Sequence, residues 1–176
     1  MSTATLEAVA PHPVVEDWND IHLEDIDPTF TAIPDDFYNL KISSAEKKSY
    51  DNTAKGGKAG ASVKFIYTVI DHPTFTGRKV FPENMFINNF NLAVFRRIMD
   101  ATGVQQGPLT FEEWLKELGS VGATLKLKVE TVDAMKYRKL ADGSGETYPD
   151  PYHIKPDGTP GKKTTINYKA GVQPSD

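Results

Sequence analysis

The sequence predicts a mainly β protein that contains one or two helices. Five segments alternate apolar and polar residues, with the period of two expected for a strand that has one buried face. A central segment changes to the helical period, with apolar residues three and four positions apart. The resulting order is three strands, one or two helices, and two further strands.

The first three strands follow one another closely. In Phe37–Lys47, Tyr38, Leu40 and Ile42 alternate with polar residues, which predicts a strand. Residues 48–61 are rich in Gly and Lys and predict a flexible hairpin loop. The second and third strands are expected at Ser62–Asp71 and Arg78–Ile87, separated by a turn. Pro82 interrupts the third strand. Because proline has no N–H to donate to a ladder, this strand should be an edge or contain a bulge.

A helical period begins after the third strand. Phe90–Thr102 places apolar residues on one helical face, and Gly103 is a suitable C-terminal cap. A second, short helix is expected at Thr110–Leu118. Thr110 is its candidate N-cap, and Glu113 stands three residues later, which completes a capping box.

The last third of the chain contains the remaining strands. Ala123–Val132 alternates again, residues 139–163 are rich in turn-forming residues and predict a long loop, and Thr164–Ala170 predicts a final strand. Three strands, a helix and two more strands are the connectivity of a five-stranded oligonucleotide-binding (OB) fold barrel, with the helix between strands three and four. A generic α+β sheet also satisfies the pattern.

Charge is distributed unevenly along the chain. All 20 basic residues lie at or after Lys41, whereas nine acidic residues and no Lys or Arg precede it. We therefore expect an acidic, largely disordered N-terminal arm over residues 1–32, an OB-fold-like nucleic-acid-binding domain over 33–170, and a flexible C-terminal end over 171–176. A basic body beside an acidic arm indicates binding to a polyanion, with the arm as a built-in competitor.

Several other function classes find no support in the sequence. The chain has no cysteine, and its four histidines have no metal-ligand spacing. Gly56-Gly57-Lys58 lacks the spacing of a phosphate-binding loop. We see no signal peptide, no membrane span and no converging catalytic residues. The expectation is a cytoplasmic protein without enzymatic activity, catalytic residues, metal site or cofactor.

The binding signal is stronger, because single-strand binding needs cations for phosphates and aromatic faces for bases. The body interleaves the two kinds of residue, and in an OB barrel the second and third strands and the loops after strands one and four form the ligand platform. The candidate nucleic-acid-binding residues are Lys48, Tyr50, Lys55, Lys58, Lys64, Tyr67, Arg78, Lys79, Lys126, Lys128, Lys136, Tyr137, Arg138 and Tyr152. Phe65 and Phe81 fit the core at least as well.

Several loose motifs resemble a phage-encoded protein family found beside phage replication and recombination genes. They are Ile33–Ile42, Gly77–Phe81, Asn88–Leu92, Gly122–Val129 and Asn167-Tyr168, which together span roughly residues 33–170. The resemblance implies a single-stranded-DNA-binding protein with an OB fold. This chain differs from the pattern in having Asp36 where the family often has Gly, and in its N-terminal acidic extension.

The leading expectation is therefore a largely sequence-independent single-stranded-DNA-binding protein of phage origin, which acts in DNA replication or recombination in the bacterial host cytoplasm. The acidic arm would compete with DNA for the basic groove or recruit a phage or host replication or recombination protein. Self-association is left open, and no membrane partner is expected. The alternative is a phage accessory or structural protein-interaction module whose acidic arm mimics DNA.

Overall fold

The computed structural model of the protein describes residues 32–176, and the expectations for the acidic arm therefore lie outside the described residues, apart from Ala32. The described chain is mainly β with two helices, as the sequence predicted. Its main sheet has six antiparallel strands, with the order β3-β2-β1-β5-β8 and with β4 also pairing with β2. The strands are β1 (Asp36–Asp51), β2 (Ala59–Val69), β3 (Lys79–Val80), β4 (Met85–Phe86), β5 (Thr124–Asp133) and β8 (Lys162–Gln173).

The main sheet does not close into the predicted barrel. Within residues 32–176 its path ends at β3 on one side and at β8 on the other. The predicted third strand is divided into β3 and β4, two residues each, and Pro82 lies in the interruption. A proline cannot donate to a ladder, so the break at this position is expected. Because the divided strand offers no continuous edge, no ladder joins it to β8.

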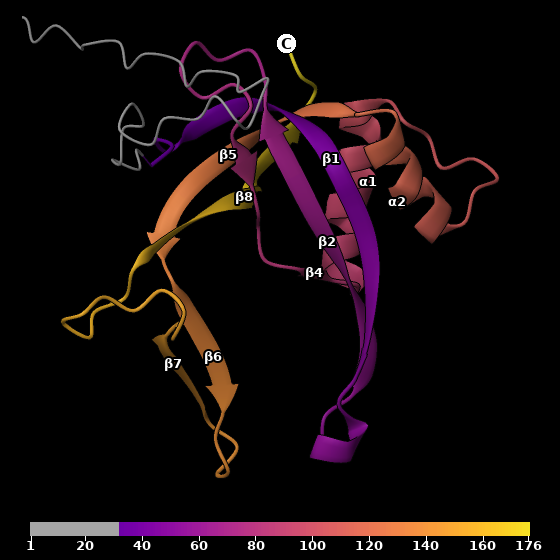
Figure 1. The fold of residues 1–176 in the computed structure, drawn as a ribbon. Helices are drawn as coiled ribbons and strands as arrows, with labels where there is room; N and C mark the ends of the chain where they lie inside the picture. The colour runs from indigo at the N-terminus through magenta and orange to yellow at the C-terminus, as the bar shows by residue number, and fades with distance from the viewer. Residues whose placement is uncertain (1–31) are drawn as a thin grey trace, which may run out of the picture.

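Both helices lie within two residues of their expected bounds, although the second continues past Leu118 to Ser120. In α1 (Asn89–Thr102), the Asn88 side chain accepts a hydrogen bond from Asn91 N, and Gly103 ends the helix with a φ of 72°. In α2 (Phe111–Ser120), Thr110 Oγ1 accepts from Glu113 N at 3.2 Å, and Glu113 Oε2 accepts from Thr110 N at 2.8 Å. The predicted capping box is therefore present. Helix α2 packs on β1, and α1 packs on β5 and β8 (Figure 1).

The core lies between the inner face of the sheet and the two helices. Strand β2 buries Val63, Phe65, Tyr67 and Val69, while the residues between them are more exposed, except that Ser62 is also buried. Strands β1 and β5 contribute alternating buried residues in the same way. Trp114 of α2 is buried, and its indole N–H donates to the carbonyl of Val104 at 2.8 Å. The alternation seen in the sequence thus corresponds to one buried face per strand.

A second sheet was not predicted. Strands β6 (Met135–Lys139) and β7 (Gly145–Pro149) form an antiparallel hairpin within and just before the segment 139–163 that was expected to be a long loop. Its residues are mostly exposed, so it lacks the buried face that produces alternation in a sequence. The last strand is also longer than expected, because residues 171–173, assigned to a flexible end, continue β8, and Val172 and Gln173 pair with β5.

Candidate nucleic-acid interface

Two β-hairpins extend from the same side of the main sheet and define the candidate interface (Figure 1). The first hairpin comprises residues 46–64 of β1, β2 and their connection, and the second comprises residues 135–150. The pairing of β5 with β8 ends at Asp133 and Lys162, directly before β6, which places the second hairpin at the end of this ladder. The two hairpins follow the first and fourth predicted strands, and they contain eight of the predicted binding residues: Lys48, Tyr50, Lys55, Lys58, Lys64, Lys136, Tyr137 and Arg138.

The first hairpin has an ordered tip. A 3-10 turn, Thr53–Lys55, follows β1, and Asp51 Oδ1 accepts hydrogen bonds from Thr53 N at 2.9 Å and Thr53 Oγ1 at 2.6 Å. The Tyr50 ring lies across Gly60 on the paired strand, where a Cβ atom would come within 2.5 Å of the Tyr50 hydroxyl oxygen. Phe86 of β4 meets the same ring edge to face at 5.7 Å. The chain therefore holds an aromatic pair beside the lysines of this hairpin.

The first hairpin has an excess of positive charge. Residues 46–64 include five lysines and two acids. Lys48 pairs with Glu46 at 2.8 Å, and Lys47 pairs with Glu112 of α2 at 3.2 Å. Hydrogen bonds from these lysines lower the pKa of both glutamates. Lys55 and Lys58 at the tip are exposed and have no ion pair with any residue in the described part of the chain. Within residues 32–176, no acidic side chain neutralises their charges.

The second hairpin is balanced in charge and rich in tyrosine. Lys136 Nζ lies 3.3 Å from Asp150 Oδ1 and 5.0 Å from the centre of the Tyr152 ring. Arg138 pairs with Glu146, and its guanidinium lies 5.1 Å from the centre of the Tyr148 ring. Tyr152 is 87% exposed. The cations of the second hairpin are therefore partly neutralised, and the exposed rings are those of Tyr137 on the hairpin and Tyr152 directly after it.

Apart from Lys64 of the first hairpin and the buried Tyr67, the remaining predicted residues form two groups. Lys79 is exposed on β3, and Arg78, directly before it, is half-buried. Lys126 and Lys128 lie on β5 at the opposite end of β1 from the hairpin tip, and they pair with Asp176 at 2.7 Å and Glu130 at 2.9 Å. The structure therefore does not bring these two lysines together with the hairpin residues.

Tyr67 is the predicted binding residue that the structure contradicts. It is fully buried and stacks on Phe65 with the ring centres 5.5 Å apart, so its face cannot meet a base. Its hydroxyl is 2.9 Å from the Tyr168 hydroxyl of β8. Burial raises the pKa of both groups, which keeps both hydroxyls neutral. The signal was visible in the sequence, because Tyr67 shares the phase of the apolar residues of its strand.

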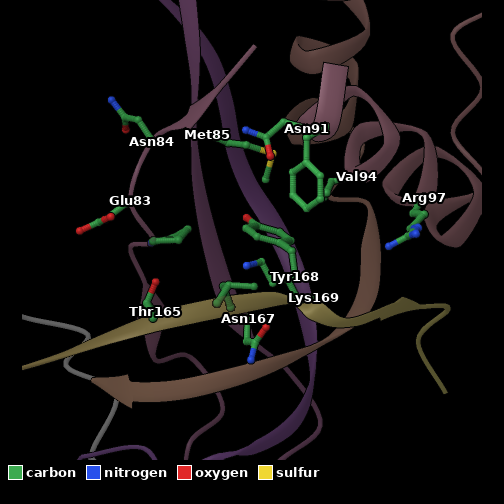
Figure 2. Close-up of a pocket in the computed structure, with 13 residues that line it drawn as sticks. Glu83, Asn84, Met85, Asn91, Val94, Arg97, Thr165, Asn167, Tyr168 and Lys169 are labelled. Carbon is green, nitrogen blue, oxygen red and sulfur yellow. The ribbon is translucent and has the colours of Figure 1, made fainter. Parts of the chain in front are cut away.

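A cleft of about 600 Å³, here called the seam cleft, lies between the two edges of the sheet (Figure 2). Its walls are Pro82–Met85, the side of α1 that carries Phe90, Asn91 and Arg97, and Thr165–Lys169 of β8. In Figure 2, Tyr168 lies near the middle, Glu83 and Asn84 lie along one side, and Arg97 lies on the other. Sequence reasoning missed this site. The available signal was the run of asparagines and phenylalanines between residues 84 and 91.

The structure and the comparisons add three plain findings. Among residues 32–176, no group of three or more His, Cys, Asp or Glu side chains is arranged to hold a metal ion. Neither described helix has the length and apolar character needed to span a bilayer. Comparisons with protein-family models, with curated proteins and with solved structures found no match to this chain.

Proposed function

We propose that this chain is a non-enzymatic, largely sequence-independent single-stranded-DNA-binding protein. The observation that carries the proposal is the pair of hairpins that extend from one side of the sheet: the first has two tip lysines without an ion pair among the described residues, and the second has exposed tyrosine rings on it and directly after it. Non-specific single-strand binding combines a cationic path for the backbone with aromatic faces for the bases. A strand that crosses from one hairpin to the other would meet both.

The fold assignment within this proposal is a partly open OB-fold. The neighbour order β3-β2-β1-β5-β8 is the order that a five-stranded Greek-key barrel would have if it were opened between its third and last strands. On this assignment, the first hairpin is the loop after strand one and the second hairpin is the loop after strand four. Both are ligand-binding loops in OB folds.

In the proposed mechanism, lysines bind the phosphates and tyrosine rings bind the bases. Lys55 and Lys58 neutralise phosphates and release condensed counterions, which lowers affinity as salt rises. Tyr137, 67% exposed, and Tyr152 stack on bases, an interaction available to every base. The resemblance stated above adds the biological setting to the proposal: a phage protein that acts in replication or recombination in the bacterial cytoplasm, with the acidic arm as competitor or recruiting segment.

Fluorescence anisotropy with labelled oligo-dT tests the proposal. We expect binding at about 50 mM salt, with log affinity falling against log salt by about 0.7 for each phosphate neutralised. A duplex of the same length should compete poorly, because its bases are stacked and offer no free faces. Failure to bind oligo-dT at about 50 mM salt would overturn the proposal and favour the protein-interaction alternative.

A further inference from the structure

The seam cleft has the size and composition of a small-molecule site. Its volume of about 600 Å³ falls within the range of about 300–1,000 Å³ that is usual for ligand pockets. Met85, Val94 and Ile166 provide an apolar lining, and Tyr168 adds a ring whose hydroxyl is already bonded to Tyr67. Phe90 stands at the wall with 65% of its side chain exposed, so one aromatic face remains open.

The polar groups of the cleft suit a nucleotide. Three amides, from Asn84, Asn91 and Asn167, offer both donors and acceptors, which is what base edges require. Asn91 Nδ2 donates to Phe86 O at 2.7 Å, and Asn167 bonds Glu130 and Ala170. The amide of Asn84 forms no hydrogen bond to any residue that the structure describes. Its donors and acceptor are therefore free for a ligand.

Two cations at the cleft have no acidic neighbour within ion-pair distance in the described chain. They are Arg97 of α1, which is exposed, and Lys169 of β8, also exposed. The adjacent Arg96, in contrast, pairs with Asp100. Two unpaired cations beside an aromatic, amide-lined cleft match a ligand that carries a phosphate on a planar ring system.

The cleft also lies on the path between the two hairpins. At one end, Asn91 bonds the carbonyl of Phe86, whose ring packs against Tyr50 of the first hairpin. At the other end, Glu83 pairs with Lys163, close to the start of β8 beside the second hairpin. A strand bound to both hairpins would therefore pass the mouth of the cleft.

We propose that the seam cleft takes up one unstacked nucleotide of the bound single strand. The base lies against Phe90 and within reach of the three asparagine amides, and its phosphate lies on Arg97 and Lys169. This inference rests on the proposed function and adds a defined subsite to it. The base must unstack from the neighbouring bases to enter the cleft. The site therefore accepts a strand end or a flexible position more readily than a duplex.

Matched double variants on the two faces of α1 test the subsite. Phe90→Ala with Arg97→Ala removes an exposed ring and a cation from the cleft. Leu92→Ala with Arg96→Ala removes an exposed apolar side chain and a cation from the other side of the same helix, where they line a different depression. All four side chains are exposed, so both variants should fold, which circular dichroism and thermal melting would verify.

The first variant should bind oligo-dT at least five-fold more weakly than wild type, with a salt slope smaller by about 0.7, because one ring and one phosphate contact are lost. The control should bind as wild type does. In a second measurement, thymidine monophosphate added to the full chain should shift the side-chain amide NMR signals of Asn84 and Asn91.

Equal affinities for the two variants, together with unshifted amide signals, would overturn the subsite while leaving the proposed function intact if wild type binds oligo-dT. That result would also be expected if an extended peptide, paired along the outer edge of β8, were the occupant of the cleft. Failure of wild type itself to bind oligo-dT would overturn the proposed function, and with it the subsite.

Discussion

Removing the two tip lysines of the first hairpin is the most direct test of how the protein would hold a single strand. Lys55 and Lys58 are exposed, lie on either side of Gly56, and have no ion pair with a described residue. We predict that the double substitution Lys55→Ala with Lys58→Ala weakens binding without unfolding the domain. No core residue is touched, and the tip is held by the Asp51 and Thr53 hydrogen bonds.

The size of the effect follows from counterion release. Each phosphate contact contributes a slope of about 0.7 in log affinity against log salt. Between about 0.1 M and 1 M salt, one decade, a single contact therefore accounts for about 0.7 log units, or about five-fold. Loss of two contacts should reduce affinity about 25-fold at 0.1 M salt and lower the slope by about 1.4.

Anisotropy titrations of labelled oligo-dT at four or five salt concentrations would measure both quantities. The matched control is Arg96→Ala with Lys116→Ala, which removes the same net charge from two exposed, ion-paired helix residues outside the interface. If the control weakened binding as much as the tip variant, the effect would be one of net charge and the hairpin assignment would be refuted. An unchanged slope in the tip variant would refute it equally.

Three further predictions concern stability and the outer face of the sheet. Thr110→Ala removes the N-cap of α2 and should lower the free energy of unfolding by about 1 kcal/mol in urea titrations, whereas a missing effect would mean that the capping box does not stabilise the fold. Tyr67→Phe removes the hydrogen bond to Tyr168 and should cost about 1 kcal/mol at pH 8. The folded pKa of Tyr67 is raised above its usual value of 10.0, so the stability that wild type gains from this hydroxyl is complete below about pH 10 and decreases as the pH rises further. The difference in urea midpoint between wild type and Tyr67→Phe should therefore narrow by about pH 11. Asp176→Asn removes the ion-pair partner of Lys126, but Lys126 lies at the opposite end of β1 from the hairpin tip, so oligo-dT affinity should change by less than about two-fold; a rise of about five-fold at about 0.1 M salt would place Lys126 in the interface.

The elements that could be predicted from sequence are those with one buried face. Phe37–Lys47, Ser62–Asp71 and Ala123–Val132 each gave a strand within a few residues of the expected bounds, because burial on one side leaves a period of two. The caps of the helices were also readable, since Thr110 and Gly103 act within their own turn. Local chemistry of this kind does not depend on the rest of the fold.

Other features depend on contacts between distant parts of the chain. The β6–β7 hairpin is largely exposed on both faces, so Met135–Lys139 shows no period. Closure of the barrel requires β8 to pair with the third strand, and this depends on how far Pro82 interrupts that strand. The composition of the segment does not determine the extent of the interruption. The cleft likewise arises from segments 80 residues apart, as the Glu83–Lys163 pair illustrates.

The candidate site shows the same division. The sequence identified the residue types, and the lysines of both hairpins, Tyr137 and Tyr152 are exposed, whereas Tyr50 and Tyr148 are half-buried. It did not identify which charges are neutralised, because partners such as Lys47 and Glu112 are far apart in sequence. Tyr67 was wrongly assigned to base stacking because it is aromatic and lies near lysines in the sequence. Its position in the alternating pattern of its strand places it in the core.

The difference in charge between the hairpins leads to a division of roles that neither hairpin reveals alone. The tip lysines of the first hairpin have no ion pair with a described residue, whereas Lys136 and Arg138 of the second are each paired with an acid and positioned against a ring. A cation already neutralised releases few counterions on binding, so the second hairpin should contribute mainly stacking, which salt screens little. Tyr137→Ala should therefore lower affinity by a similar factor at every salt concentration and leave the slope unchanged, in contrast to the tip lysines. If Tyr137→Ala instead reduced the slope, the second hairpin would be an electrostatic contact, and the assignment of charge to one hairpin and stacking to the other would be wrong.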